Sequence, residues 1–439
     1  MKKIVAVGLL WLLTGFIGVM AKNVVPIIRI NADTLTSLQV GFEMGRQSKA
    51  LFPDIERRYD NHLANILTQS KFQEVLKRRL PQILESIDPL YVSEMRGVEG
   101  AWSFVRNSEP GDGKLSLEEF FILNLLPEIG LAPSGVSFGV FSHAAADKKS
   151  IVGRNIDWQN SDALQGLQAI MVYQYKDHSV VNIGFAGVVS VLSGFNSQGL
   201  FVSLSNAAKQ SPYYSNNQSS NPEASSIGFD LRDVLFHRGS TGKAKRYLTG
   251  KHYAHNLNIL IADKDDVEVL ESSPDSDINV RYWDSDTHLS RQWGKKNQIA
   301  AVNCFVLLKM QNNCQDPKNV IRWKRLRTLA TFTNQKRASS DDVANIMFDR
   351  SNDRYEIFNK DTLQSLVYRS ATNSLYLYAS SQTMQADESL EHEVYLDLLP
   401  RKHTSAQSGN THLKSYVWVL LVAMVAALLW VFSKQENKL

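Results

Sequence analysis

The stretch Gly153-Arg154-Asn155-Ile156-Asp157-Trp158 is the part of the sequence on which the fold prediction depends. It follows an apolar run at 136–141 and a charged turn. Two further polar clusters lie downstream, Gly194-Phe195-Asn196-Ser197-Gln198-Gly199-Leu200 and Asn303-Cys304-Phe305. Taken singly, the first is typical of a structural ion pair, the second of a turn, and the third of the end of a strand. Their order and spacing therefore carry more information than any one of them.

The pattern of the chain on either side of these clusters changes near residue 134. Residues 34–130 show apolar residues at helical spacing, and Ser116 with Glu119 forms a capping box ahead of the run 117–126. From residue 136 onward we expect short strands at 136–141, 168–175, 179–185, 188–192, 201–204, 257–262, 267–270 and 299–302. Helices are expected at about 231–248 and 320–332. This order predicts an α+β fold in which helices cover two antiparallel sheets.

The three polar clusters together resemble the N-terminal-nucleophile (Ntn) hydrolases of the penicillin acyltransferase and choloylglycine (bile salt) hydrolase group. Further similarity lies at 95–101, 115–128, 258–274 and 321–326, so the resemblance covers roughly residues 90–350. It implies an αββα sandwich. It also implies an N-terminal cysteine, exposed by self-cleavage, whose thiol attacks an amide carbonyl while its own α-amino group acts as the base.

The resemblance also implies roles for several polar residues of this chain. Asp157 would orient the α-amino group, and Arg154 would tune its charge. Asn196 and Asn303 would hold the reacting carbonyl or its oxyanion, and one such donor contributes about 3 kcal/mol in other enzymes. Arg325, with Arg322 as the alternative, would complete the site.

The chain departs from the family at the nucleophile. Counting back 19 residues from Arg154 without a gap leads to Gly135, where the family carries its cysteine, and no cysteine precedes residue 304. Ser134 would serve if the register shifts by one residue and cleavage follows Pro133. Ser137 lies two residues into the expected strand.

Two functions therefore stay open. The first is a membrane-anchored hydrolase or acyltransferase of the Ntn type that acts on the amide bond of an N-acylated small molecule or lipid. The second is a catalytically silent relative that acts as a membrane-tethered binding protein. In the silent case we expect one uncut chain across residues 133–138, and we expect Gly135→Cys to restore cleavage.

Both ends of the sequence indicate a membrane. The basic start and the apolar run 4–20 predict a signal peptide, with a retained anchor as the alternative. Residues 416–432 carry no charge and would span about 26 Å as a helix. We expect a signal peptide at 1–21, a helical pro-region-like segment at 22–133, a catalytic domain at 134–401, a linker at 402–414, a transmembrane helix at 415–433 and a cytoplasmic tail at 434–439. The main domain would then face the periplasm, the cell surface or an endomembrane lumen.

Composition narrows the remaining partners. The chain has 48 basic and 44 acidic residues with both signs scattered, so no nucleic-acid partner is indicated. Its ten histidines lack paired-ligand spacing, and we expect neither a metal nor a cofactor. Cys304 and Cys314 are the two cysteines, and either a disulfide between them or two buried thiols would fit an oxidising compartment.

Overall fold

The structure is a computed structural model that describes residues 25–106, 109–158, 162–207, 224–351 and 356–379, and the backbone of 392–394. The predicted signal peptide, linker, transmembrane helix and cytoplasmic tail lie outside the described residues. Within the described ranges, no helix is long and apolar enough to cross a bilayer.

The larger of two sheets has eight strands and is mixed. Its strands in spatial order are β1 (Ile27–Asn31), β4 (Gln168–Gln174), β5 (Ser179–Phe185), β6 (Ser193–Asn196), β7 (Phe201–Asn206), β8 (Leu257–Ala262), β9 (Val267–Ser273) and β10 (Ser276–Arg281). All neighbours are antiparallel except β1 and β4, which run parallel with Ile27 opposite Ile170. The prediction of a purely antiparallel sheet is wrong at this edge, because the long helical connection between β1 and β4 lets the chain return in the same direction.

The smaller sheet has six strands and is antiparallel throughout. Its spatial order is β11 (Gln298–Ala301), β2 (Ser134–Val140), β3 (Ile151–Asp157), β12 (Thr362–Arg369), β13 (Ser374–Ala379) and β14 (His392–Val394). β2 and β3 form a hairpin in which Ser134 lies opposite Asp157 and Ser137 lies opposite Arg154. All seven residues of β3 are buried.

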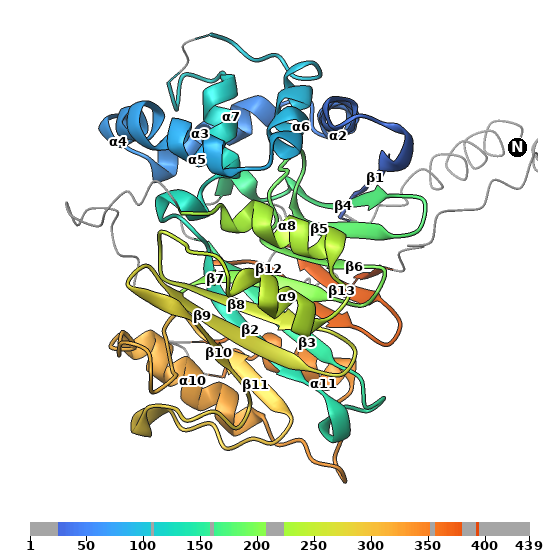
Figure 1. The fold of residues 1–439 in the computed structure, drawn as a ribbon, viewed down its shortest axis with the longest axis vertical. Coiled ribbons are helices and arrows are strands. Elements are labelled where there is room, and N and C mark those ends of the chain that lie inside the picture. Colours follow the sequence, from blue (N-terminus) through green and yellow to red (C-terminus); the bar gives the residue numbers. More distant parts are fainter. Residues whose placement is uncertain are drawn as a thin grey trace, which may run out of the picture. The chain divides into compact units, whose positions relative to one another are not determined.

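Helices cover the outer faces of both sheets. α8 (Ile227–His237) and α9 (Thr241–Leu248) contact strands β5 to β9, whereas α10 (Pro317–Leu329) contacts β11 and α11 (Ser340–Met347) contacts β3 and β12. The sheets face one another through β2 against β7 and β11 against β9. The described residues therefore form four layers in the order helix, sheet, sheet, helix (Figure 1).

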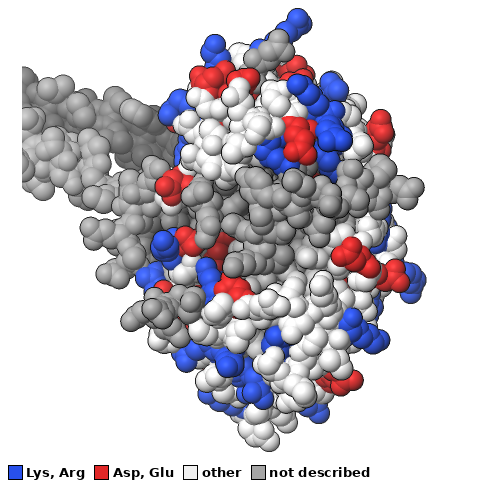
Figure 2. All heavy atoms as spheres, turned by 90° about the vertical axis from the view of Figure 1, so that its left-hand side faces the viewer, with Lys and Arg blue, Asp and Glu red and all other residues white. Residues whose placement is uncertain are grey.

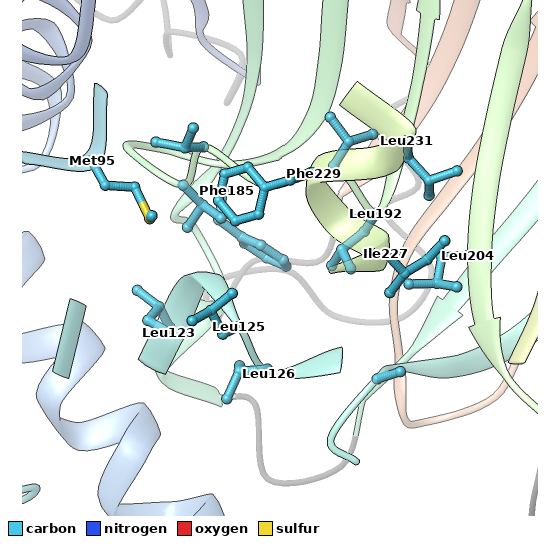
Figure 3. Packing of buried hydrophobic residues seen from close by; sticks show 14 of the residues in the cluster. Met95, Leu123, Leu125, Leu126, Phe185, Leu192, Leu204, Ile227, Phe229 and Leu231 are labelled. Atoms are coloured by element: carbon cyan, nitrogen blue, oxygen red, sulfur yellow. The ribbon is translucent and has the colours of Figure 1, made fainter. Parts of the chain in front are cut away.

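A helical subdomain precedes these layers in the sequence and packs beside β1 and β4 (Figure 1). It contains α2 (Ser37–Leu51), α3 (Ile55–Ile66), α4 (Gln69–Glu74), a π-helical stretch (Val75–Arg79), α5 (Leu80–Ser86), α6 (Pro89–Glu99) and α7 (Leu117–Asn124). α2 and α6 cross closely, because a Cβ atom at Gly41 would lie 1.8 Å from the Glu94 carbonyl oxygen. Met95 of α6, Leu123 of α7 and Phe229 of α8 meet in the apolar core that joins this subdomain to the sheets (Figure 3).

Most predicted elements are present. The capping box of Ser116 and Glu119 is confirmed, and the strand predicted at 257–262 is β8. Residues 188–192 are not a strand, and the helix expected at 231–248 is divided into α8 and α9. The division falls at Gly239, where a Cβ atom would lie 1.7 Å from the Gln198 side chain. β1, β3, β6, β10, β12, β13, β14 and α11 were not predicted as elements.

Candidate functional site

The space between the two sheets is apolar at one end and polar at the other. Side chains alternate across a strand, and Val136 and Phe138 of β2 pack with α10 and α11, so Gly135 and Ser137 face the larger sheet. Phe195, Phe201 and Tyr368 fill the apolar end. The buried polar side chains of the other end, here called the polar cluster, are Ser137, Arg154, Ser193, Ser203, Ser205, Asn258 and Asn303. Because buried polar groups are costly unless they are paired, such a cluster marks a candidate site.

Gly135 occupies the position at which the family resemblance places the nucleophile. Its amide donates a hydrogen bond of 3.1 Å to Asn303 Oδ1. Its φ angle is +141°, and a Cβ atom there would lie 1.9 Å from the Asn155 carbonyl oxygen. The backbone around this position therefore accepts only glycine. The expectation that Gly135→Cys restores cleavage is not supported, since the cysteine would clash with β3.

Asn303 is held rigidly against this glycine. Its side-chain Nδ2 donates to the Asn206 carbonyl at 2.8 Å, and its own carbonyl accepts from Asn319 Nδ2 at 3.0 Å. The next residue, Cys304, forms a disulfide with Cys314, which was one of the two arrangements predicted for the cysteines. The disulfide closes the loop that follows Asn303 and so fixes its position.

Arg154 reaches from β3 across to the larger sheet. Its Nε donates to Ser193 Oγ at 2.8 Å and its Nη2 donates to the Leu204 carbonyl. Its Nη1 is buried and has no hydrogen-bond partner among the described residues. Burial lowers the pKa of Arg154 to about 9, although the charge of Asp157 opposes this. The guanidinium therefore carries its charge at neutral pH and keeps one donor available.

Asp157 lies on the opposite face of β3, toward α10. Its carboxylate receives Arg322 Nη2 at 2.6 Å, Thr362 Oγ1 at 2.7 Å and Asn359 Nδ2 at 3.1 Å. Burial alone would raise the pKa of Asp157, but the charge of Arg322 and these hydrogen bonds outweigh it and hold the pKa below its usual value. Arg322 and Asp157 are both almost fully buried, so they form an internal ion pair.

The structure does not bring Arg325 to the site. Arg325 lies on the outer side of α10, where it forms an ion pair with Asp349 at 2.5 Å and keeps 30% of its side chain exposed. Arg322 lies three residues earlier on α10 and is the arginine that pairs with Asp157. From the sequence, Arg325 was the first choice and Arg322 the alternative. The helix turns by about 100° per residue, and the buried Trp323 and Leu326 define the inward face on which Arg322 lies.

Asn196 is also committed elsewhere. Its Nδ2 donates to the Leu235 and Arg238 carbonyls at 2.8 and 2.7 Å, and its Oδ1 accepts from the amides of Gln198 and Leu200. It closes the β6–β7 turn and the end of α8. The prediction that Asn196 holds a reacting carbonyl therefore has no support in this arrangement.

Asn206 lies six residues beyond the second cluster and was given no role from the sequence, and the structure places it near Gly135 through Asn303. Its backbone amide donates to the Pro133 carbonyl at 2.9 Å, and its backbone carbonyl accepts from Asn303 Nδ2. The signal was its place at the end of β7, adjacent to the start of β2. Asn206 therefore anchors the backbone just before Ser134.

The two candidate serines lie on opposite faces of β2. Ser134 is half-buried and lies opposite Asp157, whereas Ser137 is buried in the polar cluster opposite Arg154. Neither combines the inward direction of Gly135 with its place at the start of the strand. Neither serine therefore takes the place of Gly135, the position at which the resemblance would put a nucleophile.

A narrow apolar cavity of about 20 Å³ lies between the helical subdomain and the larger sheet. Its lining includes Trp158, which follows Asp157, and Leu192, which precedes Ser193. Leu126 and Phe185, which also line it, belong to the packed core of Figure 3. The cavity shares no lining residue with the polar cluster, and its volume is small compared with that of a ligand pocket.

Metal binding finds no support in the part of the chain that the structure describes. No group of three or more His, Cys, Asp or Glu side chains there could hold a metal ion. The two cysteines are joined to each other.

The fold and site define a mixed α+β protein with two facing sheets and a buried polar cluster at one end. No protein-family model and no curated protein matches the chain. Among solved structures, it is similar to a Caenorhabditis elegans N-acylethanolamine-hydrolyzing acid amidase ortholog, with 17% identity, a TM-score of 0.39, and coverage of 54% of this chain and 92% of that one. It is also similar to penicillin V acylase from Agrobacterium tumefaciens, with 13% identity and a TM-score of 0.37. This match covers 56% of this chain and 83% of the acylase. A mutant conjugated bile acid hydrolase from Clostridium perfringens matches with 14% identity, a TM-score of 0.35 and coverage of 62% and 99%.

Proposed function

We propose that this chain is a non-hydrolysing relative of the Ntn amide hydrolases, which binds an N-acylated small molecule or lipid without cutting it. The observation that carries this proposal is Gly135. It faces the polar cluster at the start of β2 beside Asn303, and its backbone leaves no room for a side chain. A nucleophile cannot be placed there without rebuilding the β2–β3 hairpin.

The proposed ligand is an acyl amide because two features of the described residues match the chemistry of its two ends. The free Nη1 of Arg154 and the unpartnered hydroxyl of Ser203 offer buried hydrogen-bonding groups for a carbonyl or carboxylate. The cavity beside Trp158 offers apolar contacts for an acyl chain. The cavity has a volume of only about 20 Å³. We therefore expect a bound acyl chain to widen it by displacing side chains such as Leu126.

A second candidate, a serine-using amide hydrolase or acyltransferase, is favoured by one observation. The backbone amide of Asn206 already donates a hydrogen bond to the Pro133 carbonyl. This carbonyl is the group that a nucleophile would attack if the chain were cut before Ser134. Asp157 lies opposite Ser134 and would orient a new α-amino group there. Against this, Arg322, Thr362 and Asn359 already occupy most of the acceptor positions of that carboxylate.

We also propose that the chain is anchored in a membrane through residues 415–433, with the main domain on the extracytoplasmic side. The support is the uncharged stretch 416–432 and the apolar run 4–20 near the start of the chain. Protease added to intact cells or sealed vesicles should digest the main domain. Protection of the main domain would contradict this orientation.

A binding experiment separates the two functions. We expect the purified full chain to bind N-dodecanoylglycine at least tenfold more tightly than N-acetylglycine in calorimetric titration, and to return it intact after prolonged incubation. Leu126→Ala enlarges the cavity and should tighten binding, whereas Leu126→Phe fills it and should weaken binding, with folding of both checked by circular dichroism. Equal affinity for the two probes would refute the proposed ligand. Release of free glycine would refute the proposal that the chain binds its ligand without hydrolysing it.

A further inference from the structure

One segment of the chain concentrates positive charge. Residues 289–337 contain eleven Lys or Arg and a single acidic residue, Asp316. This gives a net charge of +10 in a chain whose total is +4, so the remaining residues together carry −6. The scattering of both signs that the composition suggested does not hold for this segment.

Only some of these cations serve the interior. Arg322 is buried against Asp157, and Arg325 pairs with Asp349. A set of six others lies at the surface around the C-terminal half of α10 and forms no salt bridge among the described residues; this set, here called the basic face, is Lys295, Lys296, Lys324, Arg327, Lys336 and Arg337. Basic side chains also gather over the lower part of the molecule in Figure 2, where Figure 1 places α10.

The basic face is hollowed. Two adjoining hollows of about 490 and 480 Å³ share Lys295 in their linings. The first also contains Lys296 and the turn at 331–334, and the second contains Lys324 and Arg327. No acidic side chain lines either hollow. Clustered cations without counter-charges repel one another, so their arrangement gains energy when an anionic surface covers it.

We propose that the basic face docks the domain on the anionic phosphate headgroups of a membrane. The positive charge of the basic face would be attracted to the negative phosphate headgroups. The uncharged stretch 416–432 begins only 22 residues beyond the last described strand, β14, so a bilayer is the anionic surface within reach. Nucleic acid fits less well, because the aromatic residues of this region, Trp293, Trp323 and Phe332, are buried and offer no surface on which bases could stack. This proposal rests on the membrane anchoring proposed above and not on whether the site hydrolyses its ligand.

Lysine labelling of the full chain tests the docking. The chain is reconstituted into phosphatidylcholine vesicles with or without 30% phosphatidylglycerol and treated with an amine-reactive reagent. We expect modification of Lys295, Lys296 and Lys324 to fall severalfold in the anionic vesicles alone and to recover in 0.5 M NaCl, since salt screens such contacts. Lys77 and Lys243 are exposed elsewhere and should label equally in both vesicles.

Paired variants add a second readout. Lys324→Gln with Arg327→Gln should weaken docking about thirtyfold, because each cation near an anionic bilayer contributes about a fivefold factor. Lys77→Gln with Arg78→Gln removes the same charge from another helical segment and should change nothing. Equal labelling of the basic face in both vesicles would overturn the proposal. Protection by short DNA, but not by phosphatidylglycerol, would also overturn it and identify a different class of partner.

Discussion

Replacing Arg322 with methionine tests the buried ion pair on which the geometry at the end of β3 depends. The Asp157 carboxylate would remain buried with hydrogen bonds from Thr362 and Asn359 but without its counter-charge. Breaking a buried pair costs about 3–5 kcal/mol. Because two hydrogen bonds remain, we expect a loss near the lower end, about 3 kcal/mol at pH 7, which corresponds to a fall of about 4 °C in Tm for a protein of this size.

The pH dependence gives this prediction a sign. In the natural chain the pKa of Asp157 lies below its unfolded value, so its contribution is present at neutral pH and is lost as pH falls. In Arg322→Met burial is opposed only by the hydrogen bonds from Thr362 and Asn359, so we expect that pKa to rise above its unfolded value and the variant to lose stability as pH rises. The difference between the two proteins should therefore shrink as the pH falls from 7 toward 4.

Arg325→Met is the matched control, since it removes one cation from the same helix. Its partner Asp349 is reached at 2.5 Å, but Arg325 is 30% exposed, and exposed pairs contribute about 0–1 kcal/mol. Urea or thermal unfolding of both variants at pH 4 and pH 7 measures the contrast. Equal losses, or a larger loss from Arg325→Met, would refute the stabilising role of the buried Arg322–Asp157 ion pair.

Three further predictions concern single features of the fold. Gly135→Ala should cost at least about 2 kcal/mol in unfolding free energy because of its positive φ and the clash with β3, whereas Gly242→Ala, with open space around it in α9, should be neutral or stabilising. Reduction of the Cys304–Cys314 disulfide should cost about 3 kcal/mol, estimated from its loop length, and alkylation should find both thiols blocked until reductant is added. Burial raises the pKa of Glu128 to about 7 against the hydrogen bonds that it accepts, so stability should fall by about 3 kcal/mol between pH 4.5 and 7, and Glu128→Gln should remove that fall.

The sequence predicted the layers better than it predicted the site. The apolar run 257–262 predicted β8 correctly. All six of its residues are buried, and all are apolar except Asn258. β3 was missed because both of its faces are buried and it carries Arg154, Asn155 and Asp157, whose polar side chains hide the strand pattern. Burial of such groups depends on partners from β12 and α10, which local sequence does not reveal.

The choice between similar residues also needed the structure. Arg322 and Arg325 lie three residues apart on one helix, and only the packing of Trp323 and Leu326 decides which arginine faces inward. Asn196 and Asn206 are separated by one strand, and pairing of β7 beside β2 brings the second to the start of β2. Tertiary contacts, rather than residue type, decide these roles.

The central proposal is that Gly135 stands where the resemblance would put a nucleophile and that the chain is not cut there. Intact-mass measurement of the purified full chain, together with N-terminal sequencing of any fragment, tests it most directly. We predict a single species that is uncut across residues 133–138. A fragment that begins at Ser134, Gly135 or Ser137 would contradict the account, and loss of that fragment on changing the serine to alanine would establish a serine enzyme.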